Sequence, residues 1–190
     1  MSTATLPAPI ATPLMTGAEF LARHGDESGV ELVLGRVVMS PMPGGKHGTV
    51  CNMAAYILTR FVLESGLGRV LCNDTFLRTR TDPESYRGAD VCFLSYLRLP
   101  KDQEVPDGPI PVPEIVIEVK SPADRVNRLA AKATEYLEAG VLAVVLLIPE
   151  TKEASLFRLD ELPTRLAAGD ILTIPDVLPG FSTPVGAFFA

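Results

Sequence analysis

The segment Glu114–Lys120 combines an apolar strand pattern with charged side chains that could do chemistry. Alternate residues of a strand share a face, so Glu118 and Lys120 lie on one face, about 7 Å apart. Burial of an unpaired charge costs several kcal/mol, so both charges need each other, a metal ion or solvent. Two interpretations follow from this pattern. One is an edge strand with a solvated face and a weak ion pair, and the other is a functional site.

Asp90 supplies a second carboxylate near the start of a strand-like segment, Ala89–Ser95, 28 positions before Glu118. If the two strands are neighbours, Asp90 and Glu118 converge on one divalent ion. Hard oxygen ligands of this kind suit Mg²⁺ or Mn²⁺. Lys120 beside that ion would orient or deprotonate the attacking water and neutralise charge on a phosphate. The three residues therefore predict metal-dependent phosphodiester hydrolysis.

The strand that carries Glu118 is expected to open a βαβ unit. Ser121 and Pro122 read as the cap and first residue of a helix that runs to about Ala139. The helix N-terminus would then lie near the charged residues and favour an anion. Val141–Ile148 follows as an apolar strand buried on both faces. Strand, helix and strand in this order predict a parallel, right-handed unit.

The remaining chain shows helix and strand signals on both sides of this unit. They predict a capped helix from Thr16 and Glu19 to Gly25, a hairpin over Glu31–Ser40, a helix from Lys46 to Gly66 or Gly68, strands at Val70–Thr79 and Lys152–Asp160, and a loop from Pro100 to Pro113. Residues 171–190 have no clear assignment. Residues 1–15 contain three prolines and read as a flexible N-terminal arm. We expect residues 16–190 to form a single domain of the α/β (α+β) class, with a mixed β-sheet flanked by helices.

Composition excludes several classes of protein. The longest apolar run has eight residues, too short for a membrane span, and the first residues lack a signal-peptide pattern. We therefore expect a cytoplasmic protein with no membrane partner. The net charge of −6 argues against a protein that coats nucleic acid by bulk charge. It permits a nucleic-acid enzyme with a local basic patch.

The cysteines exclude a disulfide framework and a four-ligand zinc site. Cys51, Cys72 and Cys92 are odd in number and form no CxxC pair. The simplest interpretation is that all three are small core residues.

A series of motifs carries a family resemblance, in this order: Glu31-Leu32 before Gly35; Ser40-Pro41 and His47 before a long helix; Ala89-Asp90-Val91; Pro113-Glu114 through Glu118-Val-Lys-Ser-Pro-Ala-Asp124; Lys132, Tyr136 and Ala139-Gly140-Val141; and Pro179-Gly180-Phe181. Their order and spacing resemble the Uma-type family of restriction-endonuclease-like proteins, within the PD-(D/E)xK nuclease superfamily. The resemblance covers residues 16–189.

The resemblance implies a restriction-endonuclease-like core whose catalytic residues are Asp90, Glu118 and Lys120. It also implies that the backbone carbonyl of Val119 joins Asp90 and Glu118 in the metal shell, and that Glu31 supports the site.

Two residues depart from the family pattern. Ala89 stands where the motif has proline, which leaves the neighbouring carboxylate intact. Leu34 stands where the family usually has an acidic residue before the hairpin glycine, so any role of that acid is absent. Neither departure removes the metal site.

Three further residues have both a structural and a functional interpretation. Glu31 is either a charge on the hairpin surface or, through the resemblance, part of the site. His47 is a free loop histidine or a substrate contact. Lys132, at the margin of an apolar helix stripe, is a surface lysine or a second substrate contact.

These observations favour a metal-dependent endonuclease that acts on DNA with Mg²⁺ or Mn²⁺. Cutting a duplex needs two sites, which makes a homodimer an expectation. The alternative is a catalytically inactive nucleic-acid-binding or protein-interaction module on the same fold. A third hypothesis is a hydrolase of a smaller phosphate ester; nucleotide hydrolysis of the P-loop kind lacks its glycine-rich motif.

Overall fold

The computed structural model describes residues 13–40 and 42–190. In chain order the elements are α1 (Gly17–His24), β1 (Val30–Val33), β2 (Arg36–Met39), α2 (Gly45–Ser65), β3 (Gly68–Thr81), β4 (Glu84–Ser95), β5 (Ile115–Val119), α3 (Val126–Glu138), β6 (Ala143–Ile148), β7 (Glu153–Phe157), β8 (Thr164–Leu166), β9 (Ile171–Leu172), β10 (Thr183–Pro184) and the 3₁₀ helix η1 (Val185–Phe189). Eight strands form one sheet in the order β2-β1-β4-β5-β6-β7-β8, with β3 paired to β4 outside this row. β9 and β10 pair separately.

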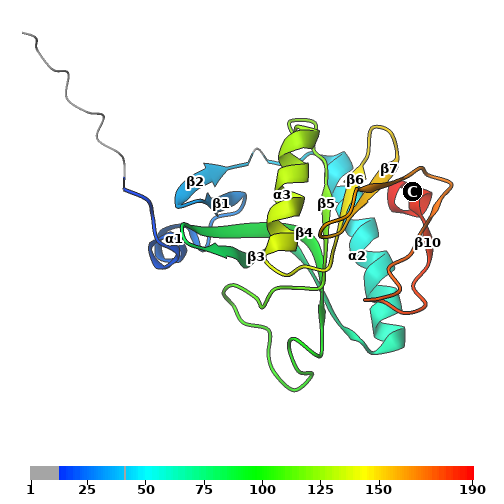
Figure 1. Ribbon diagram of the computed structural model, residues 1–190, viewed down its shortest axis with the longest axis horizontal. Helices are drawn as coiled ribbons and strands as arrows, with labels where there is room; N and C mark the ends of the chain where they lie inside the picture. Colours follow the sequence, from blue (N-terminus) through cyan, green and yellow to red (C-terminus); the bar gives the residue numbers. More distant parts are fainter. Residues whose placement is uncertain (1–12, 41) are drawn as a thin grey trace, which may run out of the picture.

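The large sheet separates two apolar layers, one beneath each long helix (Figure 1). Phe93 and Ile117 pack with α2 on one face, whereas Cys92 and Val116 pack with α3 on the other. Alternate residues of β4 and β5 therefore face opposite helices. The predicted mixed sheet flanked by helices is confirmed. Throughout the part of the chain that the structure describes, no helix combines the length and apolar character that a membrane crossing requires.

The first helix and hairpin form where they were predicted. Thr16 and Glu19 make a reciprocal capping box at the start of α1. β1 and β2 pair antiparallel around a turn at Leu34 and Gly35, which both have positive φ, 50° and 71°. This conformation is typical of the two-residue turns whose twist matches a hairpin. Leu34 therefore occupies a turn position.

β3 and β4 form a hairpin longer than the two predicted strands. The polar residues near the turn extend β4 back to Glu84, because they pair with β3 and because Tyr86 also pairs with Leu32 of β1. The register of β3 shifts between Cys72 and Thr75. This bulge lies opposite the middle of β4, which is where Asp90 is found.

The predicted βαβ unit is confirmed, but its helix begins later than expected. β5 and β6 pair in parallel, joined by α3. The prediction that the helix starts at Ser121 and Pro122 is wrong, because Asp124 Oδ2 accepts hydrogen bonds from Ser121 N and Oγ at 2.8 and 2.7 Å. This closed turn holds the chain outside the helix until Val126. The helix N-terminus is thus displaced from the end of β5.

The C-terminal residues, which had no predicted assignment, cover one side of the core. η1 packs against α2, and Leu172, Phe181 and Phe188 join the apolar layer on that side of the sheet. Their side chains are at most 4% exposed. Prolines and glycines interrupt this segment, so its apolar residues do not follow the spacing of a helix or a strand. Most of these apolar residues are nevertheless buried.

Only one of the three cysteines lies in the core, contrary to the prediction. Cys92 is buried on β4, Cys72 is exposed on β3, and Cys51 is half-buried on α2. Cys72 is exposed because it adjoins the bulge, where pairing of β3 with β4 is interrupted. All three are free thiols, which agrees with the predicted lack of a disulfide framework.

The predicted N-terminal arm, residues 1–15, falls mainly outside the described residues. At its described end, the Met15 backbone N–H donates to the carbonyl oxygen of Gly35 at 2.8 Å. The chain therefore enters α1 beside the turn between β1 and β2.

Candidate active site

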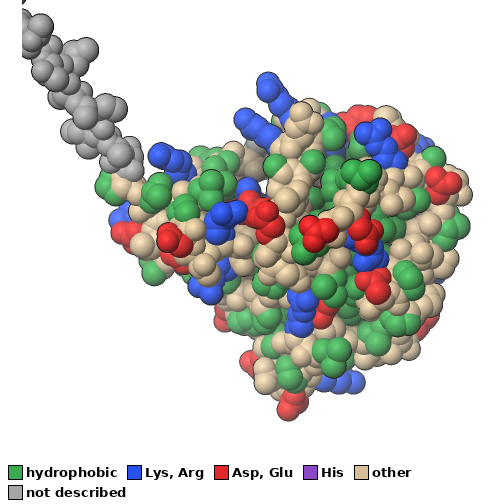
Figure 2. Space-filling model, viewed as in Figure 1, with side chains coloured by type: hydrophobic (Ala, Val, Ile, Leu, Met, Phe, Trp, Pro, Cys, Tyr) green, Lys and Arg blue, Asp and Glu red, His purple; other side chains and the backbone are tan. Residues whose placement is uncertain are grey.

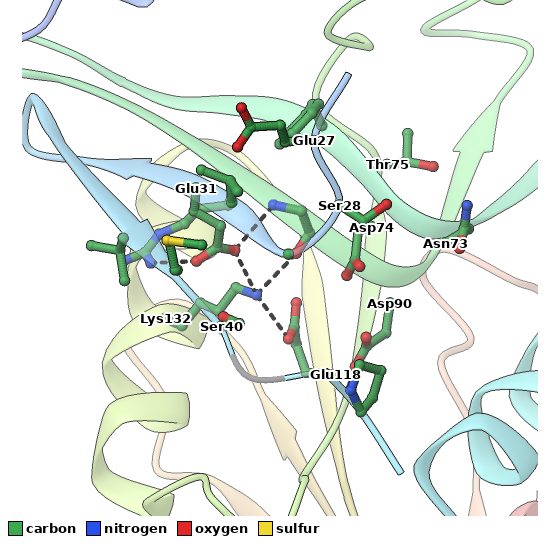
Figure 3. A pocket seen from close by; sticks show the side chains of 18 of the residues that line it. Glu27, Ser28, Glu31, Ser40, Asn73, Asp74, Thr75, Asp90, Glu118 and Lys132 are labelled. Carbon is green, nitrogen blue, oxygen red and sulfur yellow. Dashed lines mark hydrogen bonds and ion pairs between the residues drawn. The ribbon is translucent and has the colours of Figure 1, made fainter. Parts of the chain in front are cut away.

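A cavity of about 1050 Å³ opens beside α3 and the strands that it covers (Figure 3). Five of the residues predicted for the site line it, each from a different element: Glu31, His47, Asp90, Glu118 and Lys132. They come from β1, α2, β4, β5 and α3, so the fold itself brings them together. The other two predicted residues, Val119 and Lys120, are not part of the lining.

Glu118 is buried because β5 is a central strand. β5 lies between β4 and β6, and Glu118 is only 5% exposed. Its Oε2 lies 3.0 Å from Lys132 Nζ, and its Oε1 lies 2.9 Å from the Tyr136 hydroxyl. The edge-strand interpretation of this segment is therefore wrong. Both carboxyl oxygens of Glu118 have hydrogen-bonding partners on α3.

Burial raises the pKa of Glu118 to about 8, and the Lys132 ammonium offsets this only in part. The Tyr136 hydroxyl lies 2.9 Å from Glu118 Oε1 and 2.9 Å from the Gly88 carbonyl oxygen. A hydroxyl has one proton to donate, so it cannot donate to two acceptors. A protonated Glu118 resolves this, because it donates to Tyr136, which donates to Gly88.

Lys132 is not a surface lysine. Its Nζ lies 3.0 Å from Glu118 Oε2, 3.0 Å from Glu31 Oε1 and 2.9 Å from the Gly88 carbonyl oxygen. These three acceptors match the three hydrogens of an ammonium group. Burial lowers the pKa of Lys132, but the Glu118 and Glu31 carboxylates outweigh it and raise the pKa above its usual value. Lys132 therefore links the two carboxylates.

Glu31 is held by charged partners on both sides and lies in the site, not on the hairpin surface. Its Oε1 accepts from the Gly88 N–H at 3.1 Å, and its Oε2 lies 3.0 Å from Arg87. Arg87 in turn pairs with Glu135 of α3. Burial raises the pKa of Glu31, but Lys132 and Arg87 outweigh it and keep the pKa below its usual value.

Asp90 and His47 meet at the end of β5. Asp90 Oδ2 accepts from the Val119 N–H at 2.7 Å and lies 3.3 Å from His47 Nε2. The hydrogen bond to Asp90 raises the pKa of His47, which burial opposes. His47 thus contacts Asp90, one of the predicted metal ligands.

Lys120 lies apart from the cavity. Its Nζ is 3.0 Å from Glu150 Oε1 and 3.1 Å from the Ser121 carbonyl oxygen. β5 ends at Val119, so the alternation that would align Lys120 with Glu118 stops one residue earlier. Lys120 is 14% exposed and Glu150 is 45% exposed, so solvent reaches this ion pair from the Glu150 side.

Asp74 is a site residue that the sequence analysis missed. Asn73 and Asp74 have positive φ, 70° and 54°, and form the bulge in β3. Figure 3 shows the Asp74 carboxylate directed toward the space that Asp90 and Glu118 also face. Burial and the charge of Asp90 raise the pKa of Asp74. The signal was an Asn-Asp pair, which favours left-handed turn conformations, inside a predicted strand.

Cys51 is the second residue that was missed. Its Sγ lies 3.4 Å from His47 Nδ1 and 3.9 Å from Nε2, and its half-buried side chain is near Asp90. His47 and Cys51 are four residues apart, which places them on one face of α2. That spacing is visible in the sequence, and it would have separated Cys51 from the other cysteines.

The cavity fits a divalent cation by its chemistry. Asp74, Asp90 and Glu118 line it, and burial, together with the charge of Asp90, raises the pKa values of Asp74 and Glu118. A bound cation lowers the pKa of each carboxyl that it touches. Carboxylate and carbonyl oxygens are the ligands that Mg²⁺ and Mn²⁺ prefer. Asp90 and Glu118 are two carboxylates of this cavity that could hold such an ion.

Comparisons with known proteins identify the fold and the family of this chain. A solved structure described as a putative nuclease belonging to DUF820, from Anabaena variabilis, is similar with a TM-score of 0.78 and 18% sequence identity. The similarity covers 92% of this chain and 97% of that one, which shows a shared fold with the expected core. A search of curated proteins found no match.

A family model described as "Putative restriction endonuclease" matches residues 18–186, nearly the whole chain. The match spans all the elements that line the cavity, from β1 to α3. The chain therefore belongs to the Uma2 family, the family that this description names.

Proposed function

We propose that this chain is a metal-dependent endonuclease that hydrolyses phosphodiester bonds in DNA. The observation that carries the proposal is the meeting of Asp90 and Glu118, from adjacent antiparallel strands, in one cavity with Lys132. Two carboxylates and a cation in a cavity of this size suit a phosphate ester and a divalent ion. Membership of a family described as restriction endonucleases supports the same reading.

Asp90, Glu118 and the Val119 carbonyl would hold Mg²⁺ or Mn²⁺. Such an ion, when bound, polarises the phosphate and lowers the pKa of a water molecule that attacks it. Other residues of the chain hold the carboxylate oxygens of Asp90 and Glu118 in position. The Val119 N–H and His47 orient Asp90, while Lys132 and Tyr136 orient Glu118.

Lys132 and Lys120 then have different roles. All three acceptors around Lys132 belong to the protein, so we assign it to positioning Glu118 and Glu31 and not to direct contact with substrate. Lys120 is bound to the half-exposed Glu150, a surface pair that contributes little to stability. A DNA phosphate can therefore replace Glu150 at low cost, which leaves Lys120 free to stabilise charge on the phosphate or orient the water.

Contacts with DNA depend on local groups and not on a large basic face. Figure 2 shows basic and acidic side chains interspersed over the face that carries α3. His47 lines the cavity and contacts Asp90, so it can also reach a phosphate bound beside that carboxylate. We therefore assign substrate contact to His47, in addition to its hold on Asp90.

A cleavage assay tests the proposal. Wild type, Glu118→Gln, Asp90→Asn and Lys120→Ala are incubated with supercoiled, linear and single-stranded DNA in Mg²⁺, Mn²⁺ or EDTA. Glu64→Gln, an exposed carboxylate on α2, is the matched control. Metal-dependent cleavage that survives in the control and is lost in Glu118→Gln and Asp90→Asn supports the enzyme. DNA binding without divalent ions and without cleavage supports a binding module instead, and cleavage of a small phosphate diester alone supports a smaller substrate.

Cutting both strands of a duplex requires two active sites, so we also propose a homodimer. Light scattering of the purified chain, alone and with a short DNA duplex, measures its mass. A mass of twice 20.4 kDa supports the dimer. A monomer under both conditions contradicts it and leaves nicking of one strand as the expected activity.

A further inference from the structure

Beside the oxygen ligands lies a second set of donor atoms, which adds Cys51, a residue that the proposed endonuclease mechanism does not use, to His47 and Asp90. His47 Nε2 lies 3.3 Å from Asp90 Oδ2 and 3.9 Å from Cys51 Sγ. The donor atoms of these three residues all lie within 4.8 Å of one another. Two of the residues come from one face of α2 and the third from β4, so rigid elements set their spacing.

Two of the three distances between these donor atoms are close to those of a tetrahedral metal site, and the third, between Cys51 and Asp90, is within 4.8 Å. Ligand atoms bound about 2.0–2.3 Å from a tetrahedral zinc lie about 3.3–3.6 Å from each other. The distances of 3.3 and 3.9 Å from His47 Nε2 therefore need only a few tenths of an ångström of adjustment. Three protein ligands, with a fourth position left for water or a substrate atom, are typical of open zinc sites.

The donor types select a different metal from the one that the carboxylates select. Imidazole nitrogen and thiolate sulfur favour Zn²⁺ or Co²⁺ over Mg²⁺, which prefers oxygen alone. Cys51 is the cysteine suited to this role. Cys92 is fully buried in the apolar layer under α3, and Cys72 is exposed on β3.

Cys51 also lies in acidic surroundings. It is beside Asp90, and Asp74 and Glu118 line the same cavity as Asp90. A divalent ion held there would neutralise part of this negative charge and deprotonate the thiol that it binds.

We propose that His47, Cys51 and Asp90 form a sulfur-containing site for Zn²⁺ or Co²⁺, distinct from the oxygen site for Mg²⁺ or Mn²⁺ and sharing Asp90 with it. Because Asp90 belongs to both ligand sets, an ion held by Cys51 competes with an ion at the oxygen site. The inference concerns metal binding alone and stands whether or not the chain cleaves DNA.

Titration of the purified full chain with Co²⁺ tests the site, because a cobalt ion bound to thiolate has an absorption band that oxygen ligands do not produce. We expect this band in wild type and in the matched control Cys72→Ser. Cys51→Ser should lose the band and bind Co²⁺ about tenfold or more weakly, since one of three protein ligands is replaced. Asp90→Asn should weaken binding, and excess Mg²⁺ should reduce the band in wild type.

Thiol protection provides a second measurement that needs no change at the site. In Cys72→Ser, stoichiometric Zn²⁺ should slow alkylation of Cys51, and a chelator should restore its rate. Circular dichroism confirms that each variant is folded. Co²⁺ binding with no thiolate band, the same affinity in Cys51→Ser, or alkylation unchanged by Zn²⁺ overturns the proposal. Loss of the band in Cys72→Ser would assign the metal to that exposed thiol instead.

Discussion

The carboxylates of the cavity differ in pKa because their partners differ. Glu31 and Glu118 both line the cavity and both contact Lys132. Glu31 has Arg87 as a second cation, and its pKa lies below the usual value although burial opposes this. Glu118 has only Lys132, so burial prevails and its pKa rises to about 8. Within one cavity, Glu31 therefore favours the ionised form and Glu118 favours the protonated form.

The raised pKa of Glu118 makes stability depend on pH. The folded chain keeps a proton on Glu118 between pH 4.5, the ordinary pKa, and about pH 8, whereas the unfolded chain has released it. This group therefore stabilises the metal-free fold below pH 4.5, and its contribution is lost as the pH rises to about 8. The free energy of unfolding falls by up to about 1.4 kcal/mol per pH unit across this window.

Urea unfolding of wild type and Glu118→Gln in EDTA, at several pH values between about 5 and 8.5, measures this contribution. Glutamine does not titrate, so the variant should lose the downward slope. The exposed Glu64→Gln should keep it. Parallel slopes in wild type and Glu118→Gln would contradict the assignment.

Removal of the two lysines should have unequal effects on stability. Lys132→Met leaves Glu118 and Glu31 without their shared cation in a buried site, which should cost about 3–5 kcal/mol of unfolding free energy. Lys120→Met removes a surface pair with Glu150 and should cost about 1 kcal/mol or less. Urea unfolding near pH 7 measures both. A larger loss in Lys120→Met would mean that Lys120, not Lys132, is the structural partner of the site.

At the scale of elements, the bulge in β3 determines which side chains reach the cavity. A regular strand would continue pairing through Asn73 and Asp74, but their positive φ values shift the register. Gly88 of β4, which pairs with Phe76, lies next to Asp74, and its backbone N–H and carbonyl also bind Glu31 and Lys132. The bulge and this glycine together leave room for Asp74 beside the other carboxylates.

Gly88→Ala should disturb the bulge. A Cβ at this position would lie 3.0 Å from Asp74 Cβ and 3.1 Å from the Asp74 carbonyl oxygen. Because the second contact is with backbone, we expect a loss of about 1–3 kcal/mol in stability and weaker binding of Mn²⁺. Thermal unfolding and Mn²⁺ titration measure the two effects.

Gly169→Ala is the control for this substitution, because no heavy atom lies within 4 Å of its added Cβ. Its stability should change by about 0.5 kcal/mol or less, and its Mn²⁺ affinity should stay at the wild-type value. Equal behaviour of the two alanine variants would show that Asp74 does not depend on the packing at Gly88.

At the scale of the whole molecule, the C-terminal segment supports the helix that carries His47 and Cys51. η1 packs against α2, and the Phe188 side chain is fully buried in the apolar layer between α2 and the sheet. Phe188 belongs to the same apolar cluster as Val50 of α2 and Ile117 of β5, so this segment supports both the helix and the strand that carry site residues.

Phe188→Ala should lower the free energy of unfolding by about 3–5 kcal/mol, because it opens a cavity in that layer. Leu162→Ala, at a side chain that is 91% exposed, should change it by about 0.5 kcal/mol or less. Urea unfolding distinguishes them. Comparable losses in both variants would mean that burial of the C-terminal segment does not stabilise the fold.

Local signals predicted most of the elements correctly. The capping box at Thr16 and the apolar stripe of α2 depend on residues within one or two turns, so the sequence shows them directly. The predicted start of α3 was wrong because Asp124 accepts hydrogen bonds from Ser121, and the helix begins only after this turn. The same residues fit both a helix cap at Ser121 and a turn closed by Asp124, and the sequence does not show which of the two forms.

Local residue patterns predicted two carboxylates that line the cavity and the strands that carry them. Strand alternation singled out Glu118, and a strand-like segment with the same ligand chemistry singled out Asp90, since these signals depend on residue type and near neighbours. The partners of each charge depend instead on tertiary packing. Glu118 pairs with Lys132, which lies fourteen residues away on a separate helix. Lys120 pairs with Glu150 instead. The inward position of Asp74 and the approach of Cys51 to Asp90 likewise depend on how a bulge and a helix pack on β4, which no local pattern records.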